Sequence, residues 1–163
     1  MTYTYKVGEH VIHLYHGICK IDKIGSEDFY GEIREYYYLH PVFGSSGSMI
    51  IKIPCTDNQY LEKLLTKKEI DKLLKEIRNA PDKWNDNPLK RNQEFKEFFI
   101  NKNYVAIGAI IRTIKNRKDS TKKISETDKR IMETAKLLIY GIIALGIGIK
   151  YEDCEAYFFK KIS

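Results

Sequence analysis

The hydrophobic pattern of this 163-residue chain changes near Pro54, and this change limits the folds that the chain can adopt. Before Pro54, short runs rich in β-branched and aromatic residues alternate with glycines, which is typical of short antiparallel strands. After Pro54, apolar residues recur three and four positions apart, which is typical of amphipathic helices. The sequence therefore predicts an α+β fold in which a small antiparallel sheet precedes a compact all-α part.

Four apolar runs make up the expected sheet, at residues 11–14, 18–21, 36–39 and 49–53. Several short strands packed into so short a segment are typical of a small, strongly bent sheet or barrel. We expect residues 34–38 and 49–53 to be neighbouring strands. An exposed edge strand of such a barrel can pair with a strand of a partner protein.

About five helices are expected after the sheet. Thr66 and Glu69 have the spacing of a capping box, and apolar residues follow at helical spacing. Residues 79–88 contain two prolines and several Asn and Asp residues, so they predict a linker. We place a domain boundary between a β-barrel of residues 1–65 and a helical domain of residues 66–163. The remaining helices are expected from Pro88, over residues 105–117, after Ser125, and over residues 151–161.

Cysteine spacing and the N-terminal sequence exclude several classes of protein. Cys19, Cys55 and Cys154 are odd in number and lack C-x-x-C spacing, which supports neither a disulfide framework nor a zinc site. The N-terminus has no basic stretch followed by an apolar one, so we expect a cytoplasmic protein. The apolar run at residues 137–149 is too short to span a bilayer and is expected to be the buried part of a helix.

Three histidines near the N-terminus have a spacing that suggests a metal site. On a strand, however, His13 would face away from His10 and His16. We therefore expect these histidines to pack or to lie in loops, and we expect no cofactor and no metal.

Positive charge is concentrated in the second half of the chain. Residues 1–69 carry 8 Lys and Arg against 9 Asp and Glu, whereas residues 70–163 carry 20 against 13. The net charges are therefore −1 and +7. A basic half joined to a near-neutral half predicts two partners, with the basic half facing a polyanion. Solvated surface is the plainer interpretation of the same charges.

Trp84 is the only tryptophan, and it lies at the entrance to the basic half in the polar sequence DKWNDNP. A lone tryptophan is more often part of a core or a plug between domains. Its polar, proline-flanked neighbourhood favours partial exposure instead. If Trp84 is exposed, its replacement by Ala should change stability by no more than about 0.5 kcal/mol.

Motifs along nearly the whole chain resemble, in order and spacing, those of the bacterial CarD/CdnL transcription factors. In the first part they are KVGE at residues 6–9, HG at 16–17, REYY at 34–37 and IKIP at 51–54. In the second part they are Trp84, Asn92, Glu94, Ser125 and DKR at 128–130. Glu27 stands roughly where some members have an arginine that faces RNA polymerase.

The resemblance implies a Tudor-like barrel that binds the lobe of the RNA polymerase β subunit, and a helical domain that contacts promoter DNA at the upstream edge of the bubble. In the family a tryptophan wedges into the DNA at the junction of double and single strands, and Trp84 matches it. The expected polymerase-binding residues are Arg34, Tyr36, Tyr38, Lys52 and Pro54. The expected DNA-binding residues are Trp84, Lys90, Arg91, Arg117, Lys118, Lys122 and Lys123.

Three functional classes remain open from the sequence. The first is a non-enzymatic, monomeric regulator that tunes the open promoter complex without reading sequence and does not bind membranes. The second is a general nucleic-acid-binding module whose barrel binds RNA or single-stranded DNA through tyrosines. An enzyme is disfavoured because no nucleophile–base pair, carboxylate dyad or phosphate loop stands out. The transcription-repair coupling factor shares the polymerase-interacting domain, but its ATPase motif GxxxxGK[ST] does not occur in this sequence.

Overall fold

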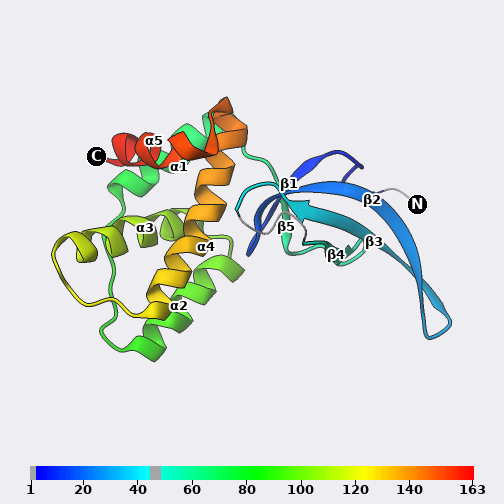
Figure 1. Cartoon of the computed structure of the whole chain (residues 1–163), viewed down its shortest axis with the longest axis horizontal. Coiled ribbons are helices and arrows are strands. Elements are labelled where there is room, and N and C mark those ends of the chain that lie inside the picture. The colour runs from blue at the N-terminus through cyan, green and yellow to red at the C-terminus, as the bar shows by residue number, and fades with distance from the viewer. Residues whose placement is uncertain (1–2, 45–48) are drawn as a thin grey trace.

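A bent antiparallel sheet precedes the helices in the computed structural model, which describes residues 3–44 and 49–163 (Figure 1). The sheet has five strands in the order β4-β3-β2-β1-β5, so β4 and β5 form its two edges. The predicted α+β fold is confirmed and is consistent with a Tudor-like domain followed by helices, although the sheet is open and not a closed barrel. The strands are β1 (His10–His13), β2 (Gly17–Phe29), β3 (Glu32–Pro41), β4 (Ile51–Pro54) and β5 (Leu61–Lys63).

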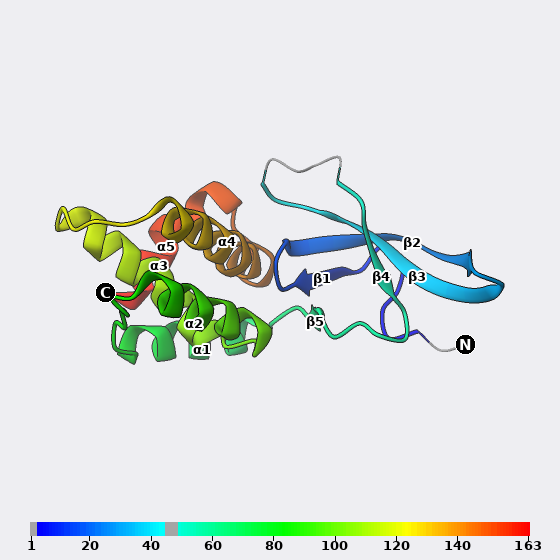
Figure 2. The same cartoon turned by 90° about the horizontal axis from the view of Figure 1, so that it is seen from below.

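Strands β2 and β3 form a hairpin that is much longer than the sequence predicts. The predicted runs at 18–21 and 36–39 are only its inner ends, and pairing continues out to Phe29 and Glu32. The register shifts between Ile21 and Lys23, and a bulge of this kind bends a strand and increases its twist. The hairpin therefore curves away from the helices and forms one end of the molecule (Figures 1 and 2).

Side chains of β3 and β4 alternate between a buried face and the opposite face of the sheet. Tyr37 and Leu39 are fully buried, and Ile51 and Ile53 lie beside them on β4. Residues two apart on a strand share a face, so these four residues form the inner face. The predicted pairing of these two strands is confirmed, because Leu39 pairs with Ile51 and Tyr37 with Ile53. The same core includes Tyr5, Val11, Cys19, Ile21 and Leu61.

The helices begin where their capping residues predict. Thr66 and Ser125 each close a capping box, and Asn87 and Asn103 accept hydrogen bonds from the first turns of their helices. Four or five strands were expected in the sheet, but the four predicted runs did not include β5. The helices are α1 (Lys67–Asn79), α2 (Pro88–Ile100), α3 (Tyr104–Asp119), α4 (Glu126–Ile143) and α5 (Cys154–Ile162), with a π-helical turn at Ala144–Gly148 and a 3₁₀ turn at Tyr151–Asp153.

Helix α4 is the central helix of this part. Most of its apolar residues are fully or almost fully buried, as Leu138, Ile139 and Ile142 show. It contacts α2, α3, α5 and strand β2. The segment Glu126–Gly148 is long and apolar enough to cross a membrane by length and composition alone, but half of the 18-residue apolar stretch within it is buried inside the protein. Its apolar character is therefore accounted for by packing against the rest of the chain, as expected for residues 137–149.

The sheet and the helices share part of their core. Ile12 and Ile18 of the sheet belong to the same buried cluster as the residues of α4. Gly17 has a φ of +72°, and a Cβ atom there would lie 2.9 Å from the carbonyl oxygen of Leu137. Only glycine allows this backbone conformation and this close approach. The division into domains of residues 1–65 and 66–163 stays a prediction.

A buried ion pair joins α2 to α4. Arg91 donates from Nε and Nη2 to the two carboxylate oxygens of Asp128, each at 3.0 Å. Asp128 also accepts a hydrogen bond from the Ser125 backbone, and Arg91 Nη1 donates to the Asn85 carbonyl at 2.8 Å. Burial raises the pKa of Asp128, but the hydrogen bonds from Arg91 and Ser125 outweigh this effect, and the pKa lies below its usual value.

We expect Asp128→Ala to destabilise the fold by about 3–5 kcal/mol, because it leaves the Arg91 guanidinium buried without its partner. Urea unfolding at pH 7 measures this loss. Asp119→Ala is the matched control, since it removes an exposed carboxylate that pairs with Lys115 and should change stability by less than about 1 kcal/mol. An equal loss in both variants would contradict the role of the buried pair.

The same substitution predicts a dependence on pH. The depressed pKa of Asp128 means that its contribution is present above its unfolded value of 3.8 and is lost as pH falls through its lower folded pKa. The stability difference between wild type and Asp128→Ala should therefore shrink as pH falls below 3.8. A difference that stays constant through this range would contradict the assignment.

Candidate polymerase-binding and nucleic-acid-binding surfaces

The five predicted polymerase-binding residues lie on one face of the β3–β4 pair. Tyr36 pairs with Pro54 and Tyr38 with Lys52 across the two strands. Arg34 lies two positions before Tyr36 on β3, so its side chain shares their face. We call this face, opposite to the buried inner face, the outer face. Residues that the sequence placed together by resemblance are therefore neighbours in the fold.

Lys52 is held in place on the outer face. Its ammonium group forms an ion pair with Glu27 of β2 and lies 4.7 Å from the centre of the Tyr36 ring. The hydrogen bond from Lys52 lowers the pKa of Glu27, which keeps this carboxylate charged. The Lys52 side chain remains 44 % exposed, whereas Tyr36 is buried. Of the two, Lys52 offers a partner much the larger exposed surface.

A groove of about 420 Å³ opens at the edge of the outer face. Arg34, Tyr36 and Pro54 line it, so it contains three of the five predicted residues. Strand β4 is one of the two edge strands of the sheet, and among the described residues no strand pairs with its outer edge, which leaves backbone groups for a partner strand. The other residues of the groove are Glu32, Ile33, Glu35, Thr56 and Asp57.

The helical part brings three predicted DNA-binding residues together in a second cleft. Trp84, Arg117 and Lys122 line a space of about 190 Å³, which we call the Trp84 cleft. Lys118 and Lys123 are exposed in the adjoining turn and loop. Lys90 is exposed in the first turn of α2 and does not line the cleft. The other residues of the cleft are Asp82, Thr113, Asn116 and Ser120.

The end of α3 positions Lys122 beside Arg117. The Lys122 amide donates to the Arg117 carbonyl at 2.8 Å, and the Thr121 amide donates to the Lys118 carbonyl at 3.1 Å. Thr121 has a φ of +55°. These two bonds and the left-handed residue form a Schellman motif, which turns the chain back at the end of a helix. The basic loop is therefore fixed by backbone hydrogen bonds.

Trp84 is half-buried and is held by its neighbours. The guanidinium carbons of Arg91 and Arg117 lie 4.1 and 3.9 Å from the centre of its ring, and the Phe95 ring meets it edge-on at 6.5 Å. Arg117 Nε is buried and has no hydrogen-bond partner within the described part of the chain. The predicted partial exposure is confirmed. The packing, however, is tighter than expected for a residue whose loss leaves stability unchanged.

The predicted role of Arg91 in DNA binding does not fit its position in the structure. The sequence suggested it as a phosphate contact, but Arg91 is only 5 % exposed. Its Nε, Nη1 and Nη2 atoms all donate to protein acceptors, namely Asp128 and the Asn85 carbonyl. The geometry therefore gives Arg91 a structural role in supporting Trp84, and we do not propose it as a DNA contact.

Asp82 holds the linker before Trp84 against α3, and sequence reasoning missed it. Its carboxylate accepts hydrogen bonds from Arg112 at 2.7 Å, Thr113 at 3.0 Å and Asn116 at 3.2 Å. Burial raises the pKa of Asp82, but these hydrogen bonds outweigh it, and the pKa lies below its usual value. All three partners lie at least 30 residues away in the sequence, so no local pattern signals them.

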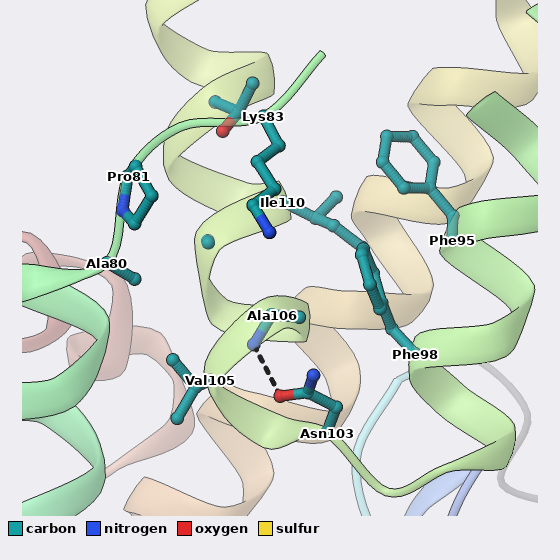
Figure 3. A pocket seen from close by; sticks show the side chains of 11 residues that line it. Ala80, Pro81, Lys83, Phe95, Phe98, Asn103, Val105, Ala106 and Ile110 are labelled. Carbon is teal, nitrogen blue, oxygen red and sulfur yellow. Dashed lines mark hydrogen bonds between the residues drawn. The ribbon is translucent and has the colours of Figure 1, made fainter. Parts of the chain in front are cut away.

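An apolar cavity of about 180 Å³ lies between α2, α3 and the linker (Figure 3). Phe95, which also contacts Trp84, and Phe98 form one wall, while Lys83 reaches across from the linker. Asn103 is committed to capping α3, because its side chain accepts a hydrogen bond from the Ala106 amide at 3.1 Å. The cavity can hold one small apolar group and contributes no reactive chemistry.

Comparison with known families identifies the first part of the chain. Residues 5–65 match the family described as the CarD-like/TRCF RID domain. This part of the chain is similar to domains of that family. The family is one of non-catalytic interaction domains found in RNA polymerase-interacting transcription factors, consistent with a CarD-like protein. The RID match includes the whole outer face and ends two residues before α1. A search of curated proteins found no match.

We expect Trp84→Ala to destabilise the protein by about 1–3 kcal/mol, less than the 3–5 kcal/mol lost on truncating a fully buried Trp. The ring loses the Phe95 contact and two cation–π contacts but is half-buried to begin with. Trp84→Phe is the control, because it keeps an aromatic ring beside both arginines. Urea unfolding decides the matter, and a loss below about 0.5 kcal/mol would show that these contacts do not hold in solution.

Proposed function

We propose that this protein is a non-enzymatic bacterial transcription regulator that binds the β-subunit lobe of RNA polymerase and contacts promoter DNA at the upstream edge of the bubble. The observation that supports it is the separation of two surfaces. The outer face lies on strands β3 and β4 of the sheet, and the Trp84 cleft lies in the helical part. Figure 1 shows the sheet and the helices side by side, with the hairpin of the sheet pointing away from the helices. One chain can therefore hold both partners at once.

The outer face supplies the polymerase contact in this proposal. The RID family match supports it, because the matched residues include all five outer-face residues. Lys52 offers an exposed ammonium group whose position is fixed by Glu27. The free edge of β4 adds backbone donors and acceptors, which give affinity when a partner strand pairs with them.

The Trp84 cleft supplies the DNA contact. Arg117, Lys118, Lys122 and Lys123 lie at one end of α3 and in the loop after it, and Lys90 adds a further charge at the start of α2. Lysines and arginines in such a group bind phosphates, which fixes the position of a protein on DNA without reading its sequence. No ordered series of base-reading side chains accompanies them within the described residues.

The Trp84 ring can stack with a DNA base if the Arg117 guanidinium moves off its face. Each cation–π contact is worth about 0.5–2 kcal/mol, and stacking of a base on an aromatic ring is worth about 1–3 kcal/mol. Exchange of the Arg117 guanidinium for an unpaired base is therefore close to balanced. The phosphate that Arg117 then binds also satisfies its Nε atom, which lacks a partner within the described residues. The phosphate contact is available on closed and open DNA alike, whereas stacking requires an unpaired base and therefore favours DNA that is already open.

Stabilisation of open DNA acts on the lifetime of the open complex. A difference of about 1.4 kcal/mol changes an equilibrium constant tenfold, so a single stacked base is enough for a large effect. The second functional class, in which tyrosines of the sheet bind single strands, is less well supported. Tyr36 is buried, and Tyr38 lies under the Lys23 ammonium group.

We expect Lys52→Glu to weaken binding to RNA polymerase by about tenfold or more while leaving the fold intact. The substitution places a second carboxylate beside Glu27 and reverses the charge offered to the partner. Lys63→Glu on β5, the other edge strand, is the matched control and should bind as wild type does. Titration with RNA polymerase in the absence of DNA measures both. Equal affinity of the two variants would contradict the role of the outer face.

We expect weak, sequence-independent binding to free DNA that falls steeply with salt, because counterion release governs phosphate contacts. The double variant Lys122→Glu/Lys123→Glu should reduce the slope of log affinity against log salt by about 1.8, since each phosphate contact contributes about 0.9. Lys67→Glu/Lys68→Glu, an equal charge change in the first turn of α1, is the control. Tight, salt-insensitive binding to one sequence would show a sequence-reading regulator instead.

A further inference from the structure

The tip of the β2–β3 hairpin has an unusual residue at its turn. Tyr30 and Gly31 form the two-residue loop, with φ angles of +52° and +85°. Positive φ at both central residues is the type I′ turn, for which Asn-Gly is the preferred sequence. A bulky residue such as tyrosine is strained in this conformation. The turn therefore carries tyrosine at a cost in stability, and residues held in strained conformations of this kind cluster at functional sites.

The same tip exposes a group of apolar side chains. Tyr30 is 96 % exposed, Ile33 68 % and Phe29 47 %. The Phe29 and Tyr30 rings meet edge-on at 4.9 Å, and the Arg34 guanidinium lies 4.4 Å from the centre of the Phe29 ring. Ile33 pairs with Asp28 and lies on the opposite face of the hairpin, so the group itself consists of Phe29 and Tyr30. Single exposed apolar residues are common, but two adjoining aromatic rings at the end of a projecting hairpin mark an interaction surface. These contacts hold the Phe29 and Tyr30 rings in place in the absence of a partner.

The tip is continuous with the outer face. Phe29 lies two positions after Glu27 on β2, and Glu27 pairs with Arg34 on β3, so all three side chains share that face. Arg34 both covers Phe29 and lines the groove with Tyr36. A partner seated on the outer face would thus meet the tip along the same surface. Tyr, Phe and Arg side chains are typical of the residues that dominate binding energy in protein interfaces.

Charge argues for a protein partner over nucleic acid. Glu27, Asp28 and Glu32 flank the tip, against Arg34 alone among the strand residues from 27 to 34. Glu27 and Glu32 are ion-paired with Lys52 and Arg34, so these five charged residues, Asp28 included, leave a net charge of −1. A surface of this sign repels phosphates weakly and is complementary to a basic rim. The hairpin also projects away from the helical part and its basic loop, so the helices do not cover it (Figures 1 and 2).

We propose that Phe29 and Tyr30 anchor the protein in an apolar depression with a basic rim on RNA polymerase, next to the surface bound by the outer face. This inference rests on the proposed function and extends it to a second contact. The anchor adds apolar burial to an interface that the Lys52 ion pair and the β4 edge alone leave polar. Tyrosine remains at a strained turn position because its ring binds the partner.

Tyr30→Asn separates binding from folding, because Asn-Gly suits the turn better than Tyr-Gly. The melting temperature of the variant should equal or exceed that of wild type. Its affinity for RNA polymerase should fall about tenfold or more. Val7→Asn, a change at a 58 % exposed apolar residue before β1, is the control and should bind as wild type does.

Lys52→Glu, measured beside Tyr30→Asn, distinguishes the two levels of the proposal. Loss of affinity in both variants supports the anchor. Loss in Lys52→Glu alone overturns the anchor and leaves the proposed function standing, whereas a wild-type chain that does not bind polymerase overturns the proposed function itself. A wild-type dimer that Tyr30→Asn dissociates, with polymerase affinity unchanged, would show instead that the tip joins two copies of this chain.

Discussion

The buried ion pair between Arg91 and Asp128 determines the arrangement of the helical part on which the proposed DNA contact depends. It fixes α2 against α4, completes the cap of α4, and holds the backbone just after Trp84 through the Asn85 carbonyl. The Arg91 guanidinium that it orients also lies over the Trp84 ring. Because a broken buried pair leaves an uncompensated charge, this arrangement is strongly specified. Trp84 is therefore presented by a rigid support.

The sheet presents the proposed polymerase-binding residues on one of its two faces. Its inner face buries aromatic and aliphatic side chains, while strand alternation places Arg34, Tyr36, Tyr38, Lys52 and Pro54 together on the outer face. The helical part anchors the sheet through Ile12, Ile18 and the close approach at Gly17. This shared core gives the two surfaces a defined relation to each other. A protein built in this way can connect a polymerase surface to DNA at a fixed distance.

Features encoded locally were predictable from the sequence, and features that depend on distant partners were not. The starts of α1 and α4 follow from capping boxes within four residues, so both were predicted. The outer half of the hairpin was missed because Gly25, Ser26 and Asp28 resemble a turn and pair only with β3. Arg91 was taken for a phosphate ligand because its partner, Asp128, lies 37 residues away. The candidate residues were predicted from the resemblance to a known family. That they lie next to one another became clear only from the structure.

The lifetime of the open promoter complex tests the central claim most directly. RNA polymerase is assembled on a promoter, challenged with competitor DNA, and followed with increasing amounts of this protein. The account predicts that the lifetime rises to a plateau as the protein saturates polymerase, by about tenfold for each 1.4 kcal/mol of stabilisation, and does so on promoters of unrelated upstream sequence. An unchanged lifetime while the protein is bound to polymerase would contradict it.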